Sequence, residues 1–128
     1  MSAQVTYPVV SDTPVSHLPF SPAVRVGDLI FVSGQASVDV TGQLVPDTFE
    51  GEFRRSMENM RKILETAGSD LKHVVQTRNY VRDAATVPRF NELYREYFSP
   101  PYPARTTITN CLSPALHYEI DCVAVAKS

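Results

Sequence analysis

The sequence predicts an α+β fold in which two helices cover one face of a single sheet. Short runs rich in Val, Ile, Thr and Tyr alternate with two longer segments whose apolar residues recur every three or four positions, so we expect the order β-β-β-α-β-α-β-β. Each helix has one apolar side, which leaves the other sheet face without a cover. The continuous apolar run 29–32 is typical of a strand buried on both faces, so we expect a second subunit to cover that face.

Composition favours one domain over residues 1–128, because a chain of this length commonly folds alone. The net charge is −2, and the basic pairs Arg54-Arg55 and Arg61-Lys62 alternate with acidic residues. Nucleic-acid binders of this size usually carry a basic excess or a basic stripe, so binding to nucleic acid is not favoured.

The chain begins without the basic and then apolar pattern of a signal peptide, and no run approaches the roughly 20 apolar residues that span a bilayer. We therefore expect a cytoplasmic protein with no membrane partner. In that compartment Cys111 and Cys122 are expected as free thiols. His17, His73 and His117 are scattered and show no metal-ligand spacing, so the sequence predicts no metal site.

The N-terminal third reads as hairpins and loops. Four of the ten prolines fall within residues 1–22, so we expect a short edge strand at 4–7 and an irregular loop at 11–22. Residues 24–35 predict a hairpin that turns at Gly27-Asp28. Gly34 indicates a bulge or the close approach of another group to the backbone. A second turn is expected at Thr41-Gly42, between short strands at 38–40 and 43–45.

Two amphipathic helices are predicted, over 47–67 and 86–98. In the first, Asp47 and Glu50 have the spacing of a capping box, and Gly68 gives the C-terminal stop. In the second, Thr86 is the expected N-cap. The apolar stripe of the first helix is expected to be core, not a cofactor site; it consists of Phe49, Phe53, Met57, Met60, Ile63, Leu64 and Ala67.

Strands are expected at 74–81, 103–111 and 118–125. Alternation predicts that Val75, Thr77, Asn79 and Val81 share one face of the first of these strands. The other two strands each carry a charged residue, and we expect Arg105 and Glu119 to lie on neighbouring strands. Two interpretations stay open for this pair. It forms a structural ion pair, or it holds a small carboxylate and a water between its members.

Five segments together resemble the YjgF/Rid family, whose best-known members are enamine and imine deaminases. They are Val26 to Gln35, Asn59 to Gly68, Phe90 to Tyr94, Pro103 to Thr106 and Tyr118 to Asp121. The resemblance runs from about Pro19 to Ala126. It implies a chorismate-mutase-like fold with a single mixed sheet. It also implies a homotrimer in which the sheets form a barrel-like centre and a ligand cleft lies at each subunit interface.

The resemblance also implies roles for single residues. Arg105 matches the arginine that holds the substrate carboxylate, and Glu119 matches the acid beside the hydrolytic water. Two further residues, Ser33 and Asn91, match polar positions of the cleft. The chain departs from the usual pattern at two more substrate-binding positions: Phe20 stands where active members usually carry tyrosine, and Thr107 stands where many carry cysteine.

The activity that the resemblance implies is the hydrolytic deamination of reactive 2-imino or enamine acids to 2-keto acids and ammonia, without a cofactor. Arginine suits a carboxylate because its planar guanidinium donates two parallel hydrogen bonds, and a glutamate can move a proton between water and the leaving nitrogen. Three alternatives stay open: a catabolic deaminase of the aminomuconate type, a non-catalytic trimer that binds small carboxylates, and an activity on RNA. The net negative charge of the chain argues against the last.

Overall fold

Six strands form one mixed sheet in the order β1-β2-β3-β6-β4-β5. The computed structural model describes residues 4–9, 13–14 and 16–127. Neighbouring strands are antiparallel except β4 and β5, which are parallel and are joined through a helix. The single mixed sheet is confirmed, and so is the order of strands and helices. The strands are β1 (Val5–Thr6), β2 (Ala23–Val26), β3 (Leu29–Ala36), β4 (Val74–Val81), β5 (Ala104–Thr109) and β6 (Tyr118–Val125).

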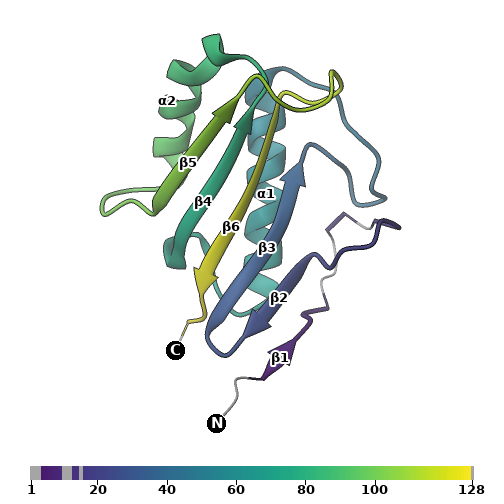
Figure 1. Ribbon diagram of the computed structural model, residues 1–128, viewed down its shortest axis with the longest axis vertical. Helices are drawn as coiled ribbons and strands as arrows, with labels where there is room; N and C mark the ends of the chain where they lie inside the picture. Colours follow the sequence, from purple (N-terminus) through teal and green to yellow (C-terminus); the bar gives the residue numbers. More distant parts are fainter. Residues whose placement is uncertain (1–3, 10–12, 15, 128) are drawn as a thin grey trace.

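Both helices lie on the same face of this sheet (Figure 1). α1 (Phe49–Thr66) packs on β3 and β6, and α2 (Val87–Tyr97) lies beside β5 in the crossover between the parallel strands. Short 3₁₀ turns, η1 (Leu71–His73) and η2 (Ala84–Thr86), precede β4 and α2. The helices therefore bury one face of the sheet only, as their single apolar sides predict.

The core lies between the helices and the sheet and is centred on aromatic rings. Phe53 of α1, Phe90 of α2 and Tyr118 of β6 are fully buried, and their ring centroids lie 4.8–6.1 Å apart. The stripe of α1 is core as predicted: its residues from Phe53 to Ala67 are buried, and Phe49 packs against them. Each large side chain buried here contributes about 1.5–3 kcal/mol to folding.

The start of α1 differs from the prediction by one residue. The N-cap is Thr48, whose Oγ1 accepts a hydrogen bond from the Gly51 amide at 3.1 Å. Asp47 does not cap the helix, because its carboxylate accepts from the Thr48 amide at 2.7 Å and pairs with Arg55. The C-terminal stop is confirmed: Gly68 has φ +94°, which favours glycine.

Thr86 is the N-cap residue of α2, as expected, but its side chain does not cap the helix. The Thr86 hydroxyl donates to the Asp83 carbonyl at 2.7 Å and makes no cap hydrogen bond. Instead the Asp83 carboxylate accepts from the Ala85 amide at 2.9 Å and begins the preceding 3₁₀ turn. The Thr86 side chain makes no cap hydrogen bond because η2 leads directly into α2. The side-chain cap is therefore made at the beginning of the combined segment, by Asp83.

Between β3 and α1 the predicted turn is present, but the predicted flanking strands are not. Val38 and Leu44 form an isolated bridge. Asp39 closes the turn, since its Oδ1 accepts hydrogen bonds from the amides of Thr41 and Gln43 at 2.9 and 3.1 Å. These hydrogen bonds to the Asp39 carboxylate fix the shape of the turn, so no regular strand pairing is needed on either side of it.

A β-bulge changes which residues of β4 face the helices. The register against β6 shifts between Val74 and Gln76, so Val74 is 7% exposed and Val75 is 45% exposed. Thr77, Asn79 and Val81 share one face, as predicted, and this face is buried under the helices. The assignment of Val75 to that face is wrong, because one extra residue in a strand reverses the side of every residue before it.

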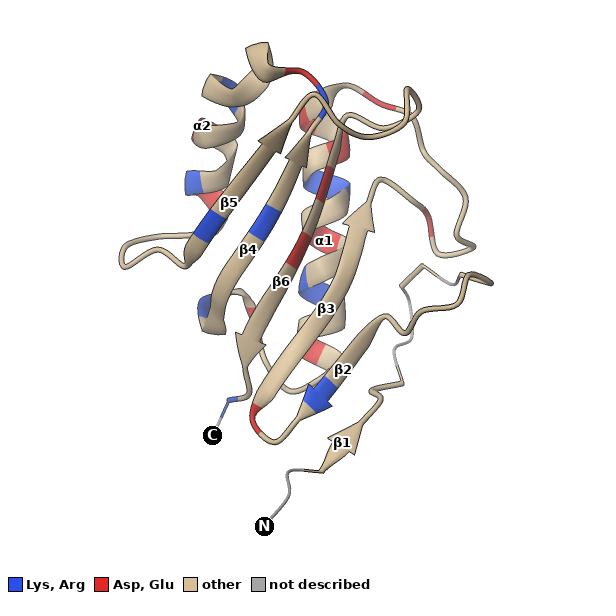
Figure 2. Ribbon diagram, viewed as in Figure 1, with Lys and Arg blue, Asp and Glu red and all other residues tan. Residues whose placement is uncertain are grey.

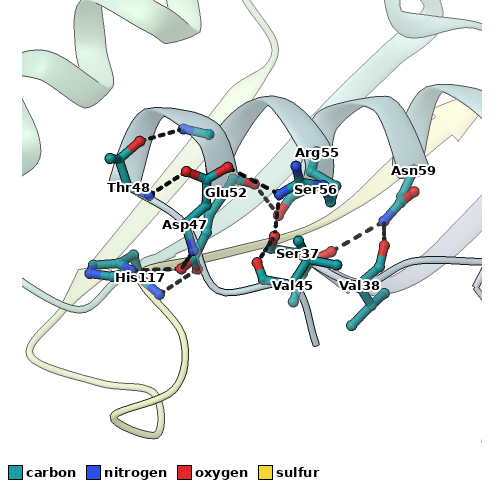
Figure 3. A network of polar contacts seen from close by, with 12 residues as sticks. Ser37, Val38, Val45, Asp47, Thr48, Glu52, Arg55, Ser56, Asn59 and His117 are labelled. Carbon is teal, nitrogen blue, oxygen red and sulfur yellow. Dashed lines mark hydrogen bonds and ion pairs between the residues drawn. The ribbon is translucent and has the colours of Figure 1, made fainter. Parts of the chain in front are cut away.

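The buried carboxylate of Glu52 joins the start of α1 to the segment before β6 (Figure 3). Glu52 is fully buried and accepts a hydrogen bond from the His117 amide at 2.8 Å. It also contacts the His117 ring at Nδ1 (2.7 Å) and accepts from the Asp47 amide at 3.2 Å. His117 therefore fixes the point at which the chain enters β6.

The face of the sheet opposite the helices carries exposed apolar side chains. Leu29, Phe31, Val75 and Ile108 are each 43–45% exposed, whereas Ile30 is buried on the helix side. The prediction of an uncovered apolar face is confirmed. Within one chain, however, residues 29–32 are buried on one face only, and the second subunit expected there stays a prediction.

The charged residues of α1 form ion pairs along its solvent face. Arg54 pairs with Glu50 at 3.2 Å, and Arg61 pairs with Glu65 at 2.7 Å. Figure 2 shows acidic and basic positions interspersed on this helix.

Both cysteines are free thiols, as expected, and burial raises the pKa of Cys122 to about 12. Within the described ranges, no helix is long and apolar enough to cross a membrane.

Candidate functional site

Arg105 lies at the start of β5 on the helix side of the sheet. It pairs in register with Thr77 of β4, which is fully buried under the helices. Its guanidinium carbon lies 5.0 Å from the ring centroids of both Phe90 and Tyr94 of α2. These aromatic faces favour the cation and fix the direction of the side chain.

A cavity of about 290 Å³ opens beside Arg105. We call it the Arg105 pocket; it is lined by Asn91, Tyr94, Arg95, Tyr102, Pro103 and Arg105. Thr107 follows Arg105 by two positions on β5 and so shares its face. The buried Oδ1 of Asn91 and Oγ1 of Thr107 have no hydrogen-bond partner in the described part of the chain. Asn91 lines the Arg105 pocket and Thr107 does not, and both oxygens are shielded from solvent in the single chain.

Tyr94 is held in place by a buried chain of hydrogen bonds that crosses three elements. Its hydroxyl lies 2.7 Å from Thr77 Oγ1, which accepts from Asn79 Nδ2 at 3.0 Å. Asn79 Oδ1 in turn accepts from the Tyr118 hydroxyl at 2.6 Å. Burial raises the pKa of Tyr94, so its hydroxyl stays neutral and hydrogen-bonded beneath Arg105.

Glu119 lies on the opposite face of the sheet, in β6 between the buried residues Tyr118 and Ile120. Beside it the ladder between β3 and β6 is interrupted between Val32 and Gln35, so Gly34 lies in a bulge. A Cβ at Gly34 would overlap the Glu119 carboxylate. The close approach that the sequence predicted at Gly34 is therefore that of Glu119.

A second cavity, of about 490 Å³, lies over Glu119. We call it the Glu119 pocket; it is lined by Leu18, Phe20, Val32, Ser33, Gly34, Arg78, Glu119 and Asp121. Phe20 is 51% exposed and forms part of the wall from the N-terminal loop. The Ser33 hydroxyl donates to the Ser21 carbonyl at 2.6 Å, and the Ser33 amide donates to the Pro22 carbonyl. Ser33 therefore fastens this loop to β3.

Charged neighbours surround Glu119. Asp121 shares its face and accepts hydrogen bonds from Arg78 Nε and from the Tyr80 hydroxyl, both at 2.9 Å. Burial raises the pKa of the Glu119 carboxyl, and the Asp121 carboxylate raises it further. A raised pKa makes this carboxylate a stronger base than an ordinary glutamate.

The structure corrects the predicted relation of Arg105 and Glu119. Their strands are not neighbours, because β4 lies between β5 and β6. The side chains also project from opposite faces: Arg105 stacks on α2, whereas Glu119 is paired in register with Tyr80 on the uncovered face. Within one chain they form neither an ion pair nor a common ligand site. The predicted site residues thus fall into two groups: Arg105, Asn91 and Thr107 on the helix side, and Glu119, Ser33 and Phe20 on the other.

The sequence-based assignment gave no role to several polar residues that line these pockets, namely Arg78, Tyr94, Arg95 and Asp121. Tyr94 and Arg95 could have been found from Asn91, because residues three and four apart share a helix face. Arg78 could not, since its pairing with Asp121 depends on the order of β4 and β6. In the ranges that the structure describes, no group of three or more His, Cys, Asp or Glu residues is placed to hold a metal ion.

A family model described as Endoribonuclease L-PSP matches residues 10–126. The chain belongs to the YjgF/Rid family. It is 36% identical over 121 residues to a 2-iminobutanoate/2-iminopropanoate deaminase of Mus musculus, covering 91% of this chain and 90% of that protein. It is also 36% identical over 109 residues to a RutC family protein of Pyrococcus abyssi, covering 84% of each chain.

A solved Rid-family structure agrees with the fold. A putative endoribonuclease from Thermotoga maritima superposes with a TM-score of 0.87 at 35% identity, and the match covers 96% of this chain and 98% of that one. The family resemblance inferred from the five sequence segments is therefore confirmed.

Proposed function

We propose that this protein hydrolyses reactive 2-imino and enamine acids to 2-keto acids and ammonia. One observation carries the proposal. Arg105 is stacked on two rings in a pocket where no acidic partner is found among the described residues, and two buried acceptors without partners lie on the same side. A guanidinium without an acidic partner matches the carboxylate of an imino acid. The name of the mouse relative supports the same reaction.

The reaction adds water to the C=N carbon. Arg105 holds the substrate carboxylate, which fixes the C=N group for attack. Glu119 accepts a proton as the water oxygen bonds to the carbon, and then gives a proton to the nitrogen. The hydroxyl of the carbinolamine so formed then gives its proton, through Glu119, to the same nitrogen; the C–N bond breaks, ammonia leaves and the carbonyl of the keto acid forms. The raised pKa of Glu119 serves both proton transfers.

The two pockets lie on opposite faces, so the catalytic pair must come from two subunits. We infer a homotrimer in which the Arg105 pocket of one subunit meets the Glu119 pocket of the next. The exposed apolar residues Leu29, Phe31 and Val75 lie on the same uncovered face as Glu119 and would be covered in such an assembly. The cytoplasmic location stays a prediction.

The proposal is tested by following 2-imino acids released from several amino acids by an amino-acid oxidase. Addition of this protein should accelerate keto-acid formation, and Arg105→Ala and Glu119→Ala should abolish the acceleration. No acceleration with any substrate, by a protein shown to be folded, would remove the general deaminase. The wild-type protein could also prove inactive but bind small carboxylates. If Glu119→Ala then binds them equally well, the non-catalytic binding protein is favoured.

A mixing experiment tests the sharing of the site between subunits. Arg105→Ala and Glu119→Ala chains are unfolded together and refolded in equal amounts. If each site takes Arg105 from one chain and Glu119 from its neighbour, random trimers should recover about one quarter of wild-type activity. A site built within one chain would recover none.

A further inference from the structure

Arg95 is a second guanidinium in the Arg105 pocket. It lies one helical turn after Asn91 on α2, so the two residues share a face, and both line the cavity. Arg95 is exposed, and Tyr102 and Pro103 form the opposite rim. The Rid-type reaction proposed above uses only one of the two guanidiniums.

The surroundings of Arg95 and Arg105 set them apart from the other arginines. Six arginines form ion pairs with acidic side chains, and a seventh, Arg82, donates to the Pro114 carbonyl. For Arg95 and Arg105 the described residues provide no ion pair. The six paired arginines are Arg25, Arg54, Arg55, Arg61, Arg78 and Arg89.

A structural role accounts for only part of this arrangement. Arg95 is in the last turn of α2, where a cation is favoured by the helix dipole. The dipole explains one positive charge at this position. It does not explain the second positive charge in the same cavity, since no acidic residue of the same chain lines this cavity and like charges repel.

The cavity size restricts the ligand. At about 290 Å³ it lies at the lower end of the range of about 300–1,000 Å³ for ligand pockets, which suits a small acid. Arg105 would bind the carboxylate next to the C=N carbon, as proposed above. A second anionic group on the same ligand would balance the charge of Arg95.

We propose that Arg95 binds a second carboxylate, so that the preferred substrates are 2-imino or enamine derivatives of short dicarboxylic acids. The inference rests on the proposed function for the reaction, but the dicarboxylate site itself is testable without it. Arg95 then determines specificity, while Arg105 anchors every substrate.

Binding is measured first, by titration calorimetry of the folded protein with glutarate and with butanoate. Glutarate should bind about tenfold more tightly, and Arg95→Gln should remove that difference while leaving butanoate unchanged. Arg89→Gln is the matched control: it removes an arginine of the same helix that is paired with Glu50 outside the pocket. Equal affinity for the two acids, or an equal loss for both in Arg95→Gln, would overturn the proposal.

Kinetics then separate this inference from the proposed function. With 2-iminoglutarate and 2-iminobutanoate as substrates, Arg95→Gln should raise KM about tenfold for the first only. Hydrolysis of both imines with no such selectivity would refute the role of Arg95 and keep the deaminase. Absence of hydrolysis, with glutarate binding that depends on Arg95, would refute the deaminase and keep the dicarboxylate site.

Discussion

The two pockets position their charged groups by different physical means. Arg105 is held by stacking on Phe90 and Tyr94, and a buried hydrogen-bond chain supports Tyr94 from below. Glu119 is held by a backbone feature, the bulge at Gly34, and its pKa is raised by burial and by Asp121. The cation site thus depends on side-chain packing between a helix and a strand, whereas the acid site depends on the backbone path of two strands. Substitutions should therefore act differently on the two pockets.

The largest effect is expected from Gly34→Ala. The new methyl group would displace the Glu119 carboxylate, and a misplacement of about 1 Å can cost about 100-fold in rate, so kcat for imine hydrolysis should fall by about that factor. Substrate KM should change little, because the new methyl group meets Glu119 and not the Arg105 that binds the carboxylate.

A double-mutant cycle on stability sharpens this test. Gly34→Ala should destabilise the wild-type chain but be nearly neutral in the Glu119→Ala background, where the overlap is gone. Equal destabilisation in both backgrounds would show that the bulge itself, and not Glu119, requires glycine.

The next effect concerns the segment that leads into β6. Glu52→Ala leaves the His117 and Asp47 amides without their acceptor, so the free energy of unfolding should fall by about 3 kcal/mol. Denaturant unfolding measures this change. Glu58→Ala, on the same helix but in an exposed ion pair with Arg61, is the control and should change stability by less than about 1 kcal/mol. Similar losses in both variants would contradict the structural role of the buried carboxylate.

A smaller effect is expected under Arg105. Tyr94→Leu removes one of the two rings and should raise substrate KM about fivefold, since a cation–π contact contributes about 1 kcal/mol. Tyr94→Phe keeps the ring and loses only the hydroxyl bonded to Thr77, so its KM should stay near the wild-type value. Steady-state kinetics on one imino acid distinguishes the two; a rise in KM for Tyr94→Phe as large as for Tyr94→Leu would shift the role from the ring to the hydroxyl.

The smallest effect is a change in pH dependence. The negative charge of Asp121 raises the pKa of Glu119, so Asp121→Asn lowers that pKa and leaves Glu119 ionised at lower pH. Because Glu119 must be ionised to accept a proton from water, the acid limb of the kcat/KM profile should move to lower pH. An unchanged limb would mean that another group controls it.

Local signals of the sequence were enough for most of the fold. The turn at Gly27-Asp28, the α1 stripe and the stop at Gly68 depend on residues close together in the chain, and each was predicted correctly. The N-cap of α1 is Thr48 and not Asp47, and Thr86 is the N-cap of α2 without a side-chain cap hydrogen bond, because its hydroxyl donates to the Asp83 carbonyl. Val75 was placed on the wrong face because a bulge depends on the partner strand.

The sequence by itself determined the family, the order of elements, the uncovered sheet face and the chemical types at the site, because periodicity, turn residues and motif residues are local properties. Only the tertiary structure decided how those residues meet. The position of β4 between β5 and β6 separates Arg105 from Glu119, and the face of α2 brings Arg95 into the Arg105 pocket. Strand order, and the face on which each side chain lies, result from pairing between distant segments of the chain. This long-range pairing therefore decides which residues come together in each pocket.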